Sequence, residues 1–238
     1  MREEKMRFES FELSASGFVR PSAVMRRMQQ AARDDLNSFG ISYEAMREKS
    51  MAFVVSRMAL VFNRPVPGEV PLVLRTAANP TRGATFPRSF VLEDEAGEPV
   101  MRAMSLWALL DFEKRTLLRP SALWEEIPSF ADLSDGVSCA RLMKPSGILP
   151  CYSEERKVYA SMLDQNNHLN NCNYADLATD LLPADAGEVK ELQIAFQHEA
   201  RLGEVLSLNG YDTSEGLLVS GGFRDREDNC FLCQIKLF

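Results

Sequence analysis

The same order of secondary-structure signals occurs twice along the 238 residues of this chain, and this repeat constrains the fold more than any other feature. In the first half, residues 7–19 predict a strand and a turn, and a helix begins at Arg20-Pro21, where proline is tolerated in the first turn. The helix ends at Gly40. Four strand-like runs follow, at residues 52–62, 70–78, 86–93 and 100–111.

The second half repeats this order. A strand predicted over residues 157–163 leads to a helix over about 171–182, which ends near Pro183. Four strand-like runs follow it, at residues 189–198, 205–211, 216–223 and 230–238. Residues 192–198 also resemble residues 59–64, and a Gly-Glu-Val triplet follows both, with one residue more before the second triplet. Duplication of one unit explains these similarities.

A helix can bury its apolar stripe against one face of an antiparallel sheet, and two such sheets can pair along their edges. We therefore expect an α+β protein with a tandem, or double, hotdog fold, in which each unit is a long helix packed on an antiparallel sheet. Residues 119–150 are rich in proline and glycine and lose periodicity. We predict an N-terminal hotdog over 1–128 that forms a wall for a substrate, a linker over 129–149 and a catalytic C-terminal hotdog over 150–238.

The candidate chemistry lies between Asp164 and Tyr174, where a carboxylate, several amides and His168 stand directly ahead of the second helix. If the approach to this helix is extended, Asp164, Asn166 and His168 share one face. The first turn of a helix leaves backbone N–H groups unpaired and stabilises anions and developing oxyanions. The segment therefore suits acid–base chemistry beside a site for negative charge.

Comparison of the two copies predicts one working site per chain. Alignment of the two helix starts places residues that cannot titrate opposite the polar residues of the second copy: Ser14 opposite Asp164, Ser16 opposite Asn166 and Phe18 opposite His168. Glu199, which follows the second histidine of the chain, His198, stands opposite Pro65 or Val66, depending on where the extra residue falls. The N-terminal unit is thus free to supply apolar walls for a substrate tail.

Charge and hydropathy exclude some classes of partner. A net charge of −7 argues against nucleic acid, and no apolar run approaches the roughly 18 residues that a membrane span needs. The first eight residues are charged and lack the apolar region of a signal peptide, so we expect a cytoplasmic protein. Basic residues on the first helix form either a solvated face or a docking surface for an acidic partner: Arg20, Arg26, Arg27 and Arg33.

The five cysteines do not predict a disulfide framework, because their number is odd and no signal peptide precedes them. Cys230-x-x-Cys233 has the spacing of a zinc or redox motif, but no second pair stands at ligand spacing and the segment has the pattern of a strand. We expect these two residues to be buried thiols.

The polar segment resembles the signature of the acyl-acyl carrier protein thioesterases of plants and bacteria. The family pattern Asp-x-Asn-x-His-(Val/Leu)-Asn-Asn-x-x-Tyr is matched by Asp164, Asn166, His168, Leu169, Asn170, Asn171 and Tyr174. Residues 105–120 are similar to the end of the family's first hotdog, and residues 196–200 to the segment that supplies its downstream glutamate, here Glu199. The resemblance covers nearly the whole chain.

Two positions depart from the family. Ala200 stands where many plant members have a cysteine, so a Cys-His mechanism is not available there. Thr76-Ala77 stands where the family has Thr-Trp, a difference that bears on the acyl pocket.

The resemblance implies hydrolysis of the thioester of acyl-acyl carrier protein (acyl-ACP) to free fatty acid and holo-carrier protein. Its partner would be a carrier protein with a phosphopantetheine-linked acyl chain. The hydrolysis would need no metal or other cofactor. The resemblance leaves open whether the chain forms a homodimer. Water would attack directly, with Glu199 or Asp164 as general base, while His168 and Asn166 position the water and the thioester. Asn170 and Asn171 would either contact the substrate or cap the helix. Tyr174 would either contact the substrate or act as a packing residue.

Other functions remain open at this point. A serine hydrolase is excluded, because the chain contains no Gly-x-Ser-x-Gly elbow. An acyl-coenzyme A thioesterase would use the same residues, and a non-catalytic acyl-binding hotdog would bind without releasing product. Three ionisable groups, Asp164, His168 and Glu199, argue against the binding protein, since an apolar groove has little need to desolvate them. Dehydratase chemistry is a weaker alternative.

Overall fold

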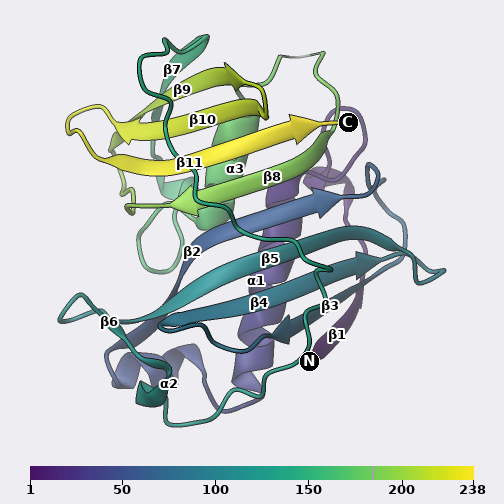
Figure 1. Cartoon of the computed structure of the whole chain (residues 1–238), viewed down its shortest axis with the longest axis vertical. Coiled ribbons are helices and arrows are strands. Elements are labelled where there is room, and N and C mark those ends of the chain that lie inside the picture. The colour runs from purple at the N-terminus through teal and green to yellow at the C-terminus, as the bar shows by residue number, and fades with distance from the viewer. Residues whose placement is uncertain (184) are drawn as a thin grey trace.

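The computed structural model describes residues 1–183 and 185–238, whose strands form one 11-stranded antiparallel sheet (Figure 1). The N-terminal half contributes β1 (Arg2–Met6), α1 (Pro21–Asn37), α2 (Tyr43–Glu48), β2 (Met51–Phe62), β3 (Leu72–Ala78), β4 (Thr85–Glu93), β5 (Pro99–Asp111) and β6 (Thr116–Leu118). The C-terminal half contributes β7 (Tyr152–Lys157), α3 (Asn171–Thr179), β8 (Val189–Phe196), β9 (Val205–Thr213), β10 (Gly216–Phe223) and β11 (Asn229–Leu237). Short 3-10 helices lie at Ser10–Glu12, Pro120–Ala122 and Ala160–Met162.

The two halves join where β2 pairs with β8. The order of strands is β1-β3-β4-β5-β2-β8-β11-β10-β9-β7, with β6 paired to β5, and at the joint Leu60 lies opposite Leu192 and Arg57 opposite Ala195. The predicted pairing of two sheets along their edges is confirmed, as is the double hotdog fold.

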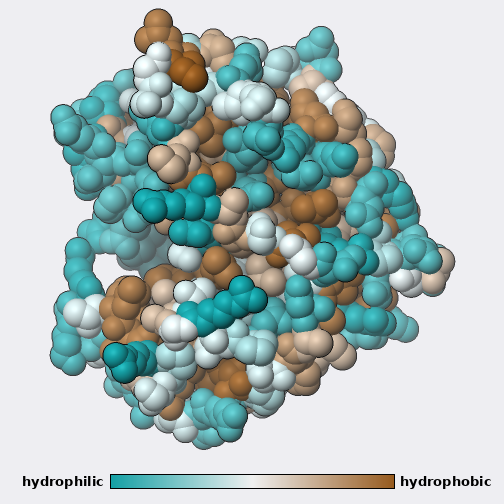
Figure 2. Space-filling view, in the orientation of Figure 1, coloured by the Kyte–Doolittle hydropathy of each residue, from teal (hydrophilic) through white to brown (hydrophobic). Residues whose placement is uncertain are grey.

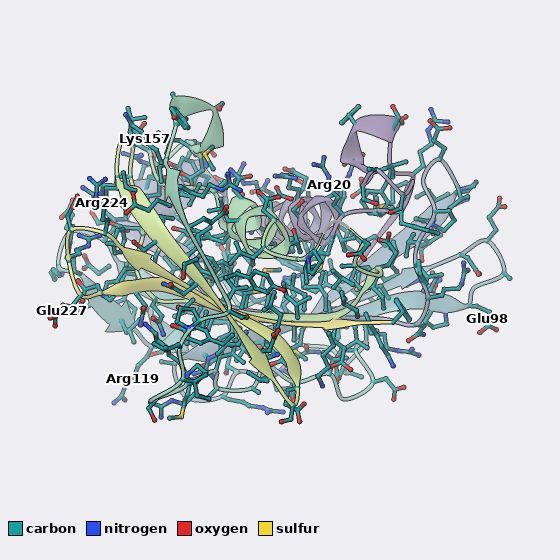
Figure 3. All side chains as sticks on the ribbon, turned by 90° about the horizontal axis from the view of Figure 1, so that it is seen from above. Arg20, Glu98, Arg119, Lys157, Arg224 and Glu227 are labelled. Carbon is teal, nitrogen blue, oxygen red and sulfur yellow. The ribbon has the colours of Figure 1, made fainter. Side chains whose placement is uncertain are left out.

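Helices α1 and α3 lie side by side on one face of this sheet, as Figure 3 shows in a view along both helices. Apolar residues of α1 at helical spacing, among them Val24, Met28 and Ala31, are fully buried in a core that also contains residues of the C-terminal half. Arg26 of α1 bridges to α3, where its Nη2 lies 3.0 Å from Asp176 Oδ2. The two units thus share one hydrophobic core.

The opposite face of the sheet is crossed by the connection between the units (Figure 1). Its backbone N–H groups at Phe130 and Leu133 donate to Ala78 O and Ser89 Oγ, at 2.8 and 3.0 Å. Figure 2 shows this side of the molecule, where hydrophilic residues are interspersed with small hydrophobic areas. No helix among the described residues is long and apolar enough to cross a membrane.

The segments that lead into α1 and α3 have the same backbone design. A bridge joins Leu13 to Val19 in the first copy and Leu163 to Leu169 in the second, and each helix begins two residues later. The turn inside each bridge has a positive φ at equivalent positions, 84° at Gly17 and 61° at Asn167. The structure therefore supports duplication with the alignment expected from the helix starts.

Two strand predictions are wrong. Residues 7–19 and 158–163 do not form strands but contain the 3-10 turns at Ser10–Glu12 and Ala160–Met162, and Lys157 is the last residue of β7. The strands that precede them, β1 and β7, are the two outermost strands of the sheet and consist largely of charged residues. Charged edge strands prevent further pairing with other chains, so their composition hides them from an apolar pattern. Helix α3 also ends at Thr179, three residues before the predicted end.

The second Gly-Glu-Val triplet follows one residue later than the first, but the backbone of the second copy contains no insertion at this place. Glu69 and Gly203 take equivalent places, since both have a positive φ, 62° and 84°, and their N–H groups donate to Phe8 O and Val158 O, both at 2.9 Å. The Gly-Glu-Val triplets are therefore offset by one position between the copies.

The same comparison fixes the counterpart of Glu199. Val66 O accepts from Val19 N in the first copy, and Ala200 O accepts from Leu169 N in the second. Glu199 therefore corresponds to Pro65, and no inserted residue alters its direction.

Candidate active site

A tight turn holds Asp164, Asn166 and His168 ahead of α3. Asp164 Oδ1 accepts the backbone N–H groups of Asn166 at 2.8 Å and His168 at 3.2 Å. The Asp164 N–H donates to His168 O at 2.8 Å, and Asn167 supplies the left-handed residue that the turn requires. The carboxylate of Asp164 thus organises the backbone that carries the other two side chains.

His168 and Glu199 meet beside this turn. His168 Nε2 lies 3.4 Å from Glu199 Oε1, with 28% of the His168 side chain and 48% of the Glu199 side chain exposed. Backbone pairing causes this proximity, because His168 bridges to Arg201 and Leu169 N donates to Ala200 O at 2.7 Å. Residues that are 31 positions apart in sequence therefore face one another.

Positive charge surrounds Glu199. Partial burial alone would raise the pKa of Glu199, but a 2.7 Å hydrogen bond from Arg201 Nη2 and the charges of His168, Arg201 and Arg115 outweigh it. The pKa of Glu199 is therefore held below its usual value. The carboxylate is ionised at neutral pH and is a weak proton acceptor there.

Tyr174 stabilises the backbone next to Glu199. Its ring is buried and packs against Phe196 and Phe231, with centroids 5.8 and 5.1 Å away. Its hydroxyl accepts the N–H of Ala200 at 3.1 Å, and burial raises the pKa of Tyr174. The hydroxyl group thus fixes the residue that follows Glu199.

The two asparagines at the helix start differ in role. Asn170 is the N-cap of α3, and its Oδ1 accepts the N–H of Cys172 at 2.9 Å. Asn171 is the first residue of the helix, half-buried, and lines the cavity described below. His198 takes no part in the turn; its Nδ1 lies 2.8 Å from Asn229 O.

A cavity of about 1340 Å³ begins at these residues and extends across the N-terminal unit. His168, Glu199 and Asn166 lie on its C-terminal side. The N-terminal unit supplies apolar residues from α1, α2 and the neighbouring strands: Leu36, Ile41, Met46, Phe53, Phe86 and Trp107. The role of this unit as a wall for a substrate stays a prediction. Its inner surface also contains one buried charge, Arg88.

Two polar residues of the site, Tyr43 and Arg201, are not among those predicted from the sequence. Tyr43 of α2 donates from its hydroxyl to Asn166 Oδ1 at 2.8 Å, although 123 residues separate them. Arg201 contacts Glu199, and its position two residues after the glutamate could have indicated this, because alternate side chains of an extended segment share a side.

The buried thiols do not offer a nucleophile. All five cysteines are free, and Cys172, Cys230 and Cys233 are buried as expected for the last two. Burial raises the pKa of Cys172 and of Cys230 to about 12, which leaves both protonated at neutral pH. Within residues 1–183 and 185–238, no group of three or more His, Cys, Asp or Glu side chains is arranged to hold a metal ion.

The fold matches known structures along its whole length. An acyl-ACP thioesterase from Bacteroides thetaiotaomicron VPI-5482 is 17% identical with a TM-score of 0.86, and the match covers 98% of this chain and 96% of that one. The 12:0-ACP thioesterase from Umbellularia californica is 19% identical with a TM-score of 0.84, with coverage of 99% and 96%. These similarities establish the fold.

Sequence relatives are found among plant proteins. The chain is 25% identical over 230 residues to the chloroplastic acyl-(acyl-carrier-protein) hydrolase FATB2 of Cuphea viscosissima, covering 86% of this chain and 54% of the relative. It is 25% identical over 232 residues to the chloroplastic palmitoyl-acyl carrier protein thioesterase of Cuphea hookeriana, covering 87% and 54%. The chain spans about half the length of the curated relatives it matches.

Family models describe both halves. Residues 2–128 match the acyl-ACP thioesterase N-terminal domain, and residues 152–228 match the acyl-ACP thioesterase C-terminal domain. Because these two matches together span more than half of the sequence, the chain belongs to the acyl-ACP thioesterase family.

Proposed function

We propose that this chain hydrolyses the thioester of acyl-ACP to a free fatty acid and holo-carrier protein. The observation that carries the proposal is the pair formed by His168 Nε2 and Glu199 Oε1, 3.4 Å apart at one end of a cavity that the N-terminal unit lines in part with apolar residues. An acyl chain would occupy the cavity over the N-terminal unit, and its thioester would lie beside the pair. The names of the plant relatives support acyl-ACP as the substrate.

His168 is the proton acceptor in this proposal. The lowered pKa of Glu199 makes its carboxylate a poor base at neutral pH, and Asp164 Oδ1 already accepts two backbone N–H groups. Imidazole, in contrast, is the side chain that most often serves as a general base in enzymes. A water seated against Nε2 and Oε1 would donate one hydrogen to each and point its lone pairs at the thioester.

The reaction then follows from these contacts. The water oxygen attacks the carbonyl carbon, its proton moves to His168, and the carboxylate of Glu199 stabilises the resulting imidazolium. Asn166 and the backbone N–H of Asn171 at the start of α3 stabilise the negative oxygen of the tetrahedral intermediate. The C–S bond breaks, and His168 returns the proton to the departing thiolate of the phosphopantetheine arm. Asp164, Asn170 and Tyr174 act as positioning residues, and Asn171 lies where it can contact the substrate.

Release of free acid tests this proposal. The purified protein is incubated with dodecanoyl- and hexadecanoyl-ACP and with the matching coenzyme A thioesters, and fatty acid is measured against time. We expect turnover of at least one acyl-ACP, and a loss of about a hundredfold in kcat for His168→Ala, since a positioned general base contributes roughly that much. Release from the coenzyme A esters alone would assign the site to that donor. Binding of acyl-ACP without release would reject hydrolysis.

A further inference from the structure

Tyr43 lies at the junction of the two units and contacts the polar turn of the second. It is the first residue of α2, whose N-cap Ser42 accepts the N–H of Ala45 at 3.1 Å. The chain reaches this point through Ile41, which packs with Met46 of α2 in a small hydrophobic cluster of the N-terminal unit. The position of Tyr43 is therefore set by elements that contain none of the signature residues.

Two arginines hold the ring and the hydroxyl group of Tyr43. The guanidinium carbons of Arg33 and Arg47 lie 5.7 and 5.8 Å from the ring centroid, within the range of cation–π contacts. Arg47 Nη1 also donates to Tyr43 Oη at 3.2 Å. Donation from a cation to the hydroxyl oxygen polarises the O–H bond, so the hydroxyl becomes a stronger donor to its own acceptor.

That acceptor is Asn166 Oδ1, at 2.8 Å. The backbone N–H of Asn166 is already donated to Asp164 Oδ1. An asparagine amide has one acceptor atom and two N–H donors. Among the residues that the structure describes, the recorded partners of Asn166 reach its backbone N–H and its Oδ1, which leaves the Nδ2–H donors for a ligand in the cavity that Asn166 lines.

We infer that Tyr43 is a positioning residue for thioester hydrolysis: it fixes the Asn166 amide so that Nδ2 donates to the carbonyl oxygen as negative charge develops there. This inference rests on the proposed function. A preoriented donor avoids reorganisation during the reaction, which is the source of oxyanion stabilisation. The N-terminal unit therefore supplies part of the polar site as well as the apolar wall.

Tyr43→Phe tests the inference, because it removes the hydroxyl and keeps the ring on which Arg33 and Arg47 stack. We expect kcat on acyl-ACP to fall about tenfold with KM changed by less than about twofold, since one hydrogen bond is lost that matters mainly in the transition state. Tyr159→Phe is the matched control, because Tyr159 is an exposed tyrosine outside the cavity lining. It should keep the kcat of the unaltered protein.

The double variant separates positioning from a general structural effect. If Tyr43 acts through Asn166, Asn166→Ala/Tyr43→Phe should have the kcat of Asn166→Ala alone, with an unchanged melting temperature for Tyr43→Phe. A further tenfold loss in the double variant would overturn the inference, as would a Tyr43→Phe protein with unaltered kcat. If the unaltered protein releases no acid from acyl-ACP, the proposed function fails and this inference with it; if it does and Tyr43→Phe matches it, only the inference fails.

Discussion

Among the neighbours of Glu199, Arg201 has the largest effect on the pKa of the carboxyl group. The hydrogen bond from Arg201 is the largest of the interactions that oppose burial and lower the pKa of Glu199. Loss of this partner should therefore raise the pKa. In Arg201→Gln, we expect the carboxyl group to take up its proton at a higher pH than in the unaltered protein, where the pKa lies below the ordinary value of 4.5.

An NMR titration of the labelled Glu199 carboxyl carbon measures this shift directly. Arg224→Gln is the control, since Arg224 is an exposed arginine paired with Asp225 and Glu155. Because the pKa is lowered by folding, Glu199 contributes stability that is present above its unfolded pKa and is lost as the pH falls through the folded one. Identical titration curves for Arg201→Gln and the unaltered protein would refute the assignment of Arg201.

Some of the individual site residues could be predicted from the sequence. The alternation of Asp164, Asn166 and His168 ahead of a helix identified the turn, because spacing within a short segment survives folding largely unchanged. The contact between Tyr43 and Asn166 leaves no local pattern, since it depends on how α2 packs against the other unit. The orientation of Glu199 likewise required the backbone pairing of Ala200 with Leu169.

Among the elements, those with an apolar period were predicted and those without one were missed. Helix α1 and the eight central strands followed from runs of buried apolar residues. The edge strands β1 and β7 carry charges instead, and α2 has only six residues, too few to show a helical period. Burial of one face of a helix or strand requires apolar residues at a regular spacing in the sequence, whereas backbone pairing at an exposed sheet edge requires no such spacing.

A buried ion pair joins α1 to β4. Arg88 Nη2 lies 2.8 Å from Asp35 Oδ2, with 6% and 3% of the two side chains exposed. Burial lowers the pKa of Arg88 and the charge of Asp35 opposes the shift, so each charge depends on the other. We expect Asp35→Ala to lower the free energy of unfolding by about 3–5 kcal/mol, because it leaves a buried charge without its partner.

Urea unfolding at neutral pH measures this loss. Replacing both charges, in Asp35→Leu/Arg88→Met, should recover most of it, since paired removal leaves no isolated charge. Asp225→Ala is the control, because its partner Arg224 is exposed and such exposed pairs contribute little to stability. An Asp35→Ala protein no less stable than Asp225→Ala would show that the pair does not hold the helix on the sheet.

The whole molecule is a duplicated unit whose copies have diverged in role. Both copies keep the bridge, the turn and the helix start, but only the second has Asp164, Asn166 and His168 in the turn. Sheet pairing between β2 and β8 and a shared core hold the copies in one body, so one cavity can draw its polar end from the second and its apolar walls from the first. Under the proposed function, the polar end would hold the thioester and the walls from the first copy would contact the acyl chain.

In the proposed mechanism, turnover depends on the charge of Glu199 beside His168. The most direct measurement compares kcat on acyl-ACP for Glu199→Gln and Glu227→Gln, since Glu227 is an exposed carboxylate at the outer edge of the molecule (Figure 3). Each variant removes one negative charge and keeps the shape of the side chain. We expect kcat to fall about a hundredfold in Glu199→Gln and to stay unchanged in Glu227→Gln. Equal kcat for the two variants would contradict this mechanism.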